Sequence, residues 1–211
     1  MVESLYIEQL IQRLHNAYPD AKIVLVFSNP MELLVATILS AQCTDEVVNR
    51  ITSSLFKKYR TAEDYAIADI SEFEKDIKSA GFYHNKAKNI IESAKLIKAN
   101  YNGNVPSTMD SLISLPGVAR KTANIVLYNA FGIIEGIAVD THVRRLSQKL
   151  GLSHSDDPVK IERDLMQIIP HRIWGSFPYL LIEHGRAVCQ ARKPKCEGCI
   201  VNDICPSAFI S

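Results

Sequence analysis

Apolar residues recur at helical spacing along almost the whole chain. The clearest runs place them three or four positions apart, at Leu10, Ile11 and Leu14; Val47, Val48, Ile51 and Leu55; Ile90, Ile91, Ala94 and Ile97; and Ile161, Leu165 and Ile168. Such spacing is typical of helices that bury one face. Only Ile23–Phe27 reads as a strand, and no second strand is available to pair with it. The pattern therefore predicts an all-α protein of about ten short helices.

Capping residues and helix breakers divide these runs. Asn29 and Asp157 each stand directly before a proline, and Ser71 and Ser107 are each followed three residues later by an acid. Both arrangements are typical of helix starts. Helix ends are expected at Pro19, Gly81, Asn102-Gly103, Gly151 and Pro170.

Length and composition are those of an ordinary globular protein. The chain has 211 residues, of which 47% are hydrophobic and 22% charged. Its N-terminal stretch lacks a basic segment followed by an apolar one, and no run of about eighteen apolar residues occurs. We therefore expect a cytoplasmic protein with no membrane partner.

Charge alone does not identify a partner, because the net charge is only +1. Basic residues nevertheless gather in two blocks. His184–Cys196 holds four of them and no acid, and Asn85–Lys98 holds four lysines and one glutamate. Either block taken alone reads as a solvated surface.

The five cysteines are unevenly spread. Cys43 stands alone and reads as a buried packing residue, whereas four others lie within seventeen residues, at Cys189, Cys196, Cys199 and Cys205. In a reducing compartment such a group indicates a metal or cluster site rather than disulfides. One tight pair between two longer loops suits zinc and an iron–sulfur cluster about equally. The tail has few apolar residues, so it needs the bound centre to hold its shape.

The segment LPGVARKTANIVL, residues 115–127, predicts a hairpin turn that leads into a helix. Backbone N–H groups at such a helix start bind phosphate readily. The positive helix end, adjacent Arg120 and partial burial would each lower the pKa of Lys121, and a neutral amine is a nucleophile. A lysine that only binds phosphate is the alternative.

The segment IAVDTHVRRL places Asp140 where it would cap a second helix. A structural cap explains this residue without any catalytic role. His142 on the same turn reads as a hydrogen-bonded structural histidine.

The cysteine spacing, LPGVARKTA and VDTH together resemble the endonuclease III family of DNA repair glycosylases, and the resemblance runs from the N-terminal helix to the last cysteine. It implies that the four clustered cysteines hold a structural [4Fe–4S] cluster. It also implies that Lys121 attacks the sugar of a damaged nucleotide and forms a Schiff base, while Asp140 faces it. Adenine glycosylases of the same superfamily lack this lysine and remove only the base.

The resemblance assigns DNA contacts to further residues. The turn at Gly117 and Ala119 would grip the DNA backbone, although the family commonly has a second glycine where this chain has Ala119. Its methyl group would lift the phosphate contact or forbid a left-handed backbone angle. Gln42 would enter the gap left by an extruded nucleotide and Phe82 would act as an apolar wedge; a surface polar residue and a core aromatic are the alternatives. Lys193 would bind phosphate from a loop that the cluster holds.

The implied fold has two helical lobes with a DNA cleft between them. Residues 21–135 would form a multi-helix barrel lobe that carries the helix–hairpin–helix, and 1–20 together with 136–211 would form the cluster lobe. The implied function is removal of oxidised pyrimidines from duplex DNA, with AP lyase activity by β-elimination, by a monomer. The alternatives are a monofunctional adenine or mismatch glycosylase and a non-enzymatic DNA-binding iron–sulfur protein.

Overall fold

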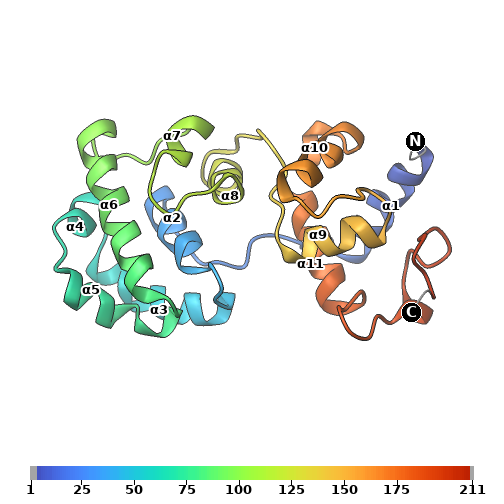
Figure 1. Cartoon of the computed structure of the whole chain (residues 1–211), viewed down its shortest axis with the longest axis horizontal. Coiled ribbons are helices and arrows are strands. Elements are labelled where there is room, and N and C mark those ends of the chain that lie inside the picture. The colour runs from blue at the N-terminus through green and yellow to red at the C-terminus, as the bar shows by residue number, and fades with distance from the viewer. Residues whose placement is uncertain (1–3, 210–211) are drawn as a thin grey trace. The chain divides into compact units, whose positions relative to one another are not determined.

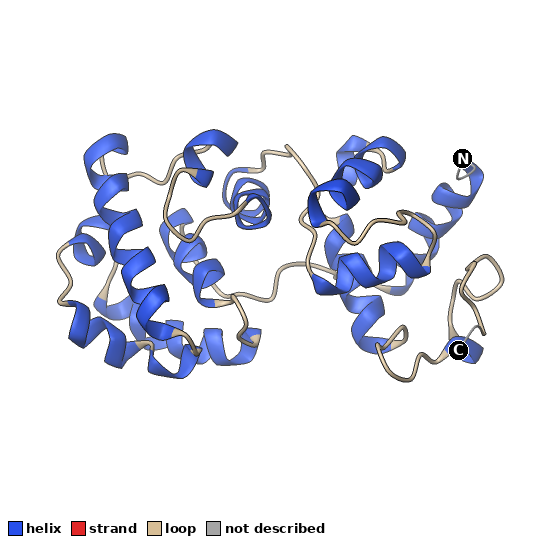
Figure 2. Cartoon of the chain, viewed as in Figure 1, coloured by secondary structure: helices blue, strands red, loops and turns tan. Residues whose placement is uncertain are grey.

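The structure is a computed structural model that describes residues 4–209, and within this range it contains helices and loops but no strand (Figure 2). The all-α prediction is confirmed. The α-helices run in the order α1 Ser4–Ala17, α2 Pro30–Leu39, α3 Asp45–Lys58, α4 Ala62–Ala66, α5 Ile70–Asp76, α6 Tyr83–Tyr101, α7 Met109–Ile113, α8 Arg120–Phe131, α9 Thr141–Lys149, α10 Pro158–Ile168 and α11 Phe177–Ala187 (Figure 1). The described residues also form three 3₁₀ turns, η1 Lys78–Ala80 and η2 His171–Ile173 between α-helices, and η3 Cys196–Gly198 after α11. No helix among the described residues is both long enough and apolar enough to cross a lipid bilayer.

The strand candidate Ile23–Phe27, which has no partner in the sequence, does not form a strand. The side chain of Asn49 takes the place of a partner strand, because its Oδ1 accepts from the N–H of Val26 and its Nδ2 donates to the carbonyl of Val24, both at 2.9 Å. Without a second strand to continue this pairing, the segment remains an extended connection.

Of the four helix starts predicted from capping residues and prolines, two are found and two are displaced. Asn29 accepts from the N–H of Glu32, and Asp157 accepts from two N–H groups of α10. The cap of α5 is Asp69 rather than Ser71, and the cap of α7 is Thr108 rather than Ser107. In both displaced cases a neighbouring Asp or Thr side chain supplies the same oxygen acceptor.

The contacts divide the chain into two compact units, Val24–Ile133 and Met1–Ile23 with Ile134–Ser211. In the first unit α2 is buried on nearly every side, and it contacts α3, α6 and α8 (Figure 1). Tyr59, Tyr65 and Phe73 form an aromatic cluster there, with ring centroids 5.2–5.9 Å apart. A uniformly apolar helix such as α2 requires this enclosed position.

The second unit joins the N-terminal helix to the C-terminal part of the chain. Ile7, Leu10 and Leu14 of α1 pack in one core with residues of α9, α10 and α11. Arg13 of α1 forms a two-pronged ion pair with Asp203 and donates to the carbonyl of Ile200 at 3.1 Å. These contacts fasten the cysteine-rich tail to a helix.

Replacing the cap of α2 should destabilise the protein measurably. Asn29→Ala removes the acceptor for the Glu32 N–H, so we expect a loss of about 1 kcal/mol of unfolding free energy in denaturant titrations. Asn100→Ala, at an exposed position inside α6, is the control and should leave stability unchanged or slightly raised. Equal effects of both changes would contradict the role given to the cap.

Candidate functional site

The turn between α7 and α8 packs against α6, which contacts it through two side chains. Ser93 donates from its hydroxyl to the carbonyl of Pro116 at 2.9 Å. Gly117 has φ +77°, and a Cβ on it would lie 2.8 Å from Nδ2 of Asn89. Both the backbone angle and the close contact therefore require glycine at this position.

Ala119 is the residue before α8, and its backbone is extended, with φ −91° and ψ 169°. Of the two effects expected from its methyl group, the conflict with a left-handed angle is therefore wrong. Ala119 offers no side-chain acceptor, and α8 starts without a side-chain cap. The N–H groups at the start of α8 thus keep the capacity to bind an anion.

Lys121 is the second residue of α8, directly after Arg120, as expected. The expected partial burial is wrong, because Lys121 is exposed. Lys121 lies in the first turn of α8, whereas the buried residues of this helix begin at Ala123. Desolvation of this amine would require a bound molecule to cover it.

Gln42 and Phe82 occupy two turns that share an unusual backbone geometry. Both residues are left-handed although neither is glycine, with φ +52° and φ +48°. Gln42 is exposed just beyond the end of α2, and Phe82 is 67% exposed directly before α6. The core alternative for Phe82 is therefore wrong. Strained turns that hold side chains out into solvent are typical of contact sites.

Asp140 lies in the other unit, at the start of α9. Its Oδ1 accepts from the N–H of Val143 at 2.7 Å, so the cap is confirmed. The side chain is only partly buried. His142, expected to be hydrogen-bonded, instead has a buried Nδ1 without a partner among the described residues and lies against Gly185 of α11.

The four clustered cysteines line a single cavity of about 750 Å³ at the end of α11. No three His, Cys, Asp or Glu side chains among the described residues converge as the ligands of one ion do. A zinc ion needs four sulfurs about 2.3 Å from a single centre, whereas a cube of iron and sulfide binds each thiolate at a different iron. Four thiols that line one cavity are the donor set that such a cluster needs.

Neighbouring side chains hold this donor set in place. Arg145 of α9 donates to the carbonyl of Cys189 at 2.8 Å. Burial raises the pKa of the thiols of Cys189, Cys199 and Cys205. Binding of iron to these cysteines must therefore release protons.

A buried histidine lies behind one of the thiols. His184 is 1% exposed, its Nδ1 is 3.1 Å from the hydroxyl of Tyr18, and its Nε2 is 3.6 Å from Sγ of Cys199. Burial lowers the pKa of His184, which favours the neutral ring. With Nδ1 accepting from Tyr18, the Nε2 proton is directed at the sulfur.

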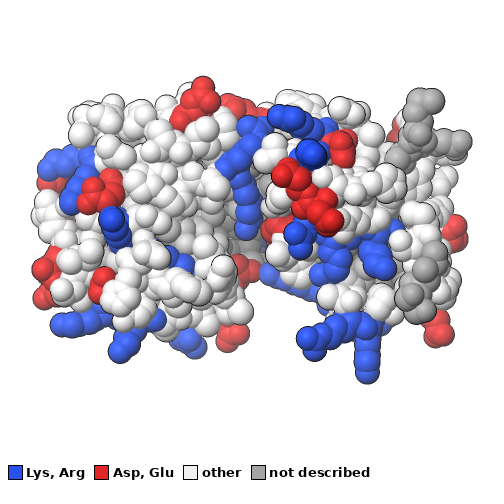
Figure 3. All heavy atoms as spheres, viewed as in Figure 1, with Lys and Arg blue, Asp and Glu red and all other residues white. Residues whose placement is uncertain are grey.

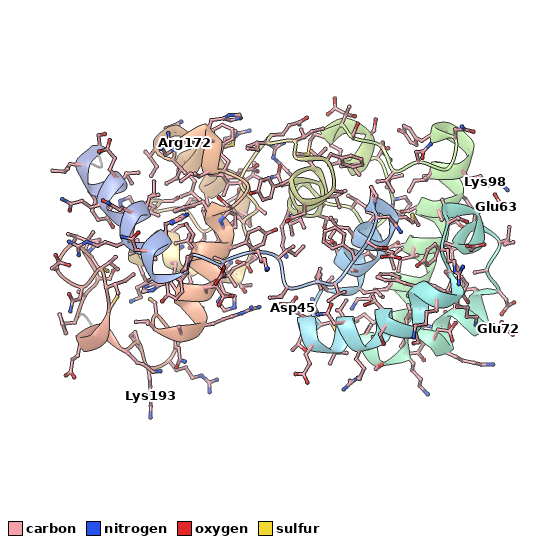
Figure 4. All side chains as sticks on the ribbon, turned by 180° about the vertical axis from the view of Figure 1, so that it is seen from behind. Asp45, Glu63, Glu72, Lys98, Arg172 and Lys193 are labelled. Atoms are coloured by element: carbon pink, nitrogen blue, oxygen red, sulfur yellow. The ribbon has the colours of Figure 1, made fainter. Side chains whose placement is uncertain are left out.

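The loop between the first two cysteines is basic and open. Lys193 is exposed, and its side chain extends away from the protein in Figure 4. Lys195 instead turns back and donates to the carbonyl of Ala187 at 3.3 Å. Figure 3 shows basic side chains gathered around the end of α11 and the following loop, with few acids among them.

Lys86 is buried, although the basic block that contains it is predicted from the sequence to be solvated. Lys86 is 5% exposed and donates from Nζ to the carbonyls of Leu39 and Ala80. A signal was available, because Lys86 lies four residues before Ile90 and so falls on the buried stripe of α6. His184 carried no comparable signal, since its role depends on the fold of the tail.

Two domain descriptions match most of the chain. The HhH-GPD superfamily of base excision DNA repair proteins matches residues 35–171, and the iron–sulfur binding domain of endonuclease III matches residues 189–205. The latter range begins and ends at the outer two of the four clustered cysteines. The cofactor of this chain is a [4Fe–4S] cluster.

Whole proteins and solved structures agree with these matches. Endonuclease III of Synechocystis sp. is 52% identical over 96% of this chain and 93% of its own length, and that of Bacillus subtilis is 46% identical over 94% and 91%. The structure of a trapped endonuclease III–DNA covalent intermediate superposes with a TM-score of 0.93 at 44% identity, covering 99% of this chain and 98% of that one. A thermostable thymine-DNA glycosylase superposes with a TM-score of 0.87 at 25% identity, covering 97% of each chain. A chain matched over this length belongs to the endonuclease III family of base excision DNA repair proteins.

Proposed function

We propose that this DNA glycosylase and AP lyase removes oxidised, ring-saturated or fragmented pyrimidines from duplex DNA and then cuts the strand on the 3′ side of the abasic site. It acts as a monomer on DNA in the cytoplasm. The observation that carries this proposal is a lysine, Lys121, in the first turn of an uncapped helix that follows a backbone-binding turn. The trapped covalent endonuclease III–DNA intermediate, 44% identical to this chain, supports it.

Lys121 is the nucleophile. Its Nζ forms a bond to the anomeric carbon of the sugar as the bond from that carbon to the base breaks, and the base departs with a proton. Ring opening gives a Schiff base between Nζ and the sugar. Loss of a proton from the adjacent carbon then expels the 3′ phosphate, which is β-elimination. Because Lys121 is exposed, its amine is open to a sugar presented by bound DNA.

Asp140 stabilises the positive charge that develops on the sugar while the base leaves. Its cap bond to the Val143 N–H fixes the position of the carboxylate, and the side chain remains partly open to a ligand. A fixed negative charge at that point lowers the energy of the transition state more than that of the ground state.

The remaining contacts hold the duplex and fill the gap. The N–H groups around Gly117 and Ala119 bind phosphate oxygens without reading sequence. Gln42 enters the space of the extruded nucleotide and bonds to the orphaned base, and Phe82 wedges from the other side. Lys193 adds a phosphate contact from the loop that the cluster holds.

Lys121→Gln should abolish strand cutting and borohydride trapping on abasic duplex DNA, because the glutamine amide is not a nucleophile. Folding should persist, since removal of a cation from a helix start is neutral or favourable by about 0.3–1 kcal/mol. Lys160→Gln is the control, because Lys160 is another exposed lysine in the first turn of a helix. Trapping by the Lys121 variant would exclude Lys121 as the nucleophile. If the unaltered protein released the base from a damaged duplex but formed no trapped adduct, it would be a monofunctional glycosylase.

Asp140→Asn should lower the single-turnover rate of base excision by about 100-fold while DNA affinity is retained. Asparagine caps helices as well as aspartate does, so only the charge is lost. Asp157→Asn makes the same exchange at the start of α10 and should leave the rate unchanged. If Asp140→Asn also left the rate unchanged, Asp140 would be a structural cap only.

Lys193→Gln should weaken binding to duplex DNA of any sequence by a similar factor. One phosphate contact fewer lowers the slope of log affinity against log salt by about 0.9. Lys95→Gln, which changes an exposed lysine of α6 paired with Glu92, should leave the slope unaltered. An unchanged slope for the Lys193 variant would remove this residue from the DNA contact.

A further inference from the structure

Lys86 is a buried cation whose partners are all neutral backbone groups. Its Nζ donates to the carbonyl of Leu39 at 2.8 Å and to that of Ala80 at 2.6 Å. None of the ion pairs found among residues 4–209 includes it. Burial lowers the pKa of this ammonium, and the thiol of nearby Cys43 acts in the opposite direction. Burial of a lysine at such a position costs free energy, because the ammonium loses its hydration.

The two acceptors are the last residues of two elements. Leu39 ends α2 and Ala80 ends η1. Carbonyls at a helix end lack partners within the helix and carry the negative end of its dipole. One ammonium therefore caps two ends at once and fixes them to each other through the first turn of α6.

Each capped end leads directly into a turn that carries a proposed gap-filling residue. Gln42 follows Leu39 by three residues, and Phe82 follows Ala80 by two. Phe82 is fixed a second time, because its carbonyl accepts from the backbone N–H of Lys86 at 3.3 Å. Both turns are left-handed at a residue that disfavours this angle, so they need an external restraint to stay populated.

We propose that Lys86 is a positioning residue that joins the Gln42 turn and the Phe82 turn into one preformed device for filling the gap in a duplex. The proposal rests on the function proposed above for Gln42 and Phe82. Without this tie, the two side chains would have to be ordered at the moment of nucleotide extrusion. The cost of ordering would then be drawn from the binding energy of the duplex.

The test compares Lys86→Met on two abasic substrates, a duplex and a single strand. Only the duplex has an orphaned base and a gap, so only the duplex requires the device. We expect the single-turnover rate of strand cutting to fall about 10- to 100-fold on the duplex. Borohydride trapping on the single-stranded oligonucleotide should stay within about twofold of the unaltered protein. Lys95→Met on the same helix is the matched control and should change neither rate.

Three outcomes would overturn the proposal. The first is an equal loss on both substrates, which would indicate general damage to the unit that carries Lys121. The second is no loss on the duplex. The third is full additivity when Lys86→Met is combined with Gln42→Ala, because residues that act through one device give less than the sum of their separate effects.

The variant should fold, because methionine is similar to lysine in length. The substitution leaves two carbonyls without a donor, but it also removes the free-energy cost of a buried charge, and the two effects oppose each other. Thermal unfolding and the cluster absorbance check this. If Lys86→Met fails to fold, Lys86→Gln keeps a donor for one carbonyl and should show the same difference between duplex and single strand. If the unaltered protein forms no borohydride adduct with either substrate, the proposed function itself is wrong. That result differs from the three outcomes that would overturn the role of Lys86.

Discussion

The ends of helices impose the constraint on which this protein is built. Every helix leaves several N–H groups without partners at its start and several carbonyls at its end, and these groups need partners from elsewhere. At α9 and α10 aspartate side chains supply them. At α8 no side chain does, and at the ends of α2 and η1 a lysine from a third element does. The residues to which we assign catalysis and gap filling lie at or beside these ends rather than along helix faces.

The cysteine-rich tail follows a different principle, because it has little regular structure to satisfy. Beyond α11 the described chain contains only the short turn η3. Its order depends on side chains from other elements, through Arg145 at Cys189 and Arg13 at Asp203 and Ile200. Arg145 and Arg13 thus hold the beginning and the later part of the segment that carries the four cysteines.

Much of this could be predicted from the sequence, because helix periodicity and capping are local. Asp140 and Asp157 were identified as caps from their immediate neighbours. Burial could not be predicted in the same way, since it depends on how elements pack. Lys121 was expected to be partly buried and is exposed, while Lys86 was read as solvated and is buried. The left-handed angles at Gln42 and Phe82 were also invisible, because no glycine or asparagine marks them.

The union of α1 with the far end of the chain has a consequence for biosynthesis. Ile7, Leu10 and Leu14 pack against a core whose other fully buried members all follow Gly136. During synthesis α1 therefore emerges on the order of ten seconds before those partners exist. The unit Val24–Ile133 is continuous and has no such wait. Helix α1 thus leaves the ribosome well before the helices against which it packs, and its apolar face must stay unengaged until those helices have followed.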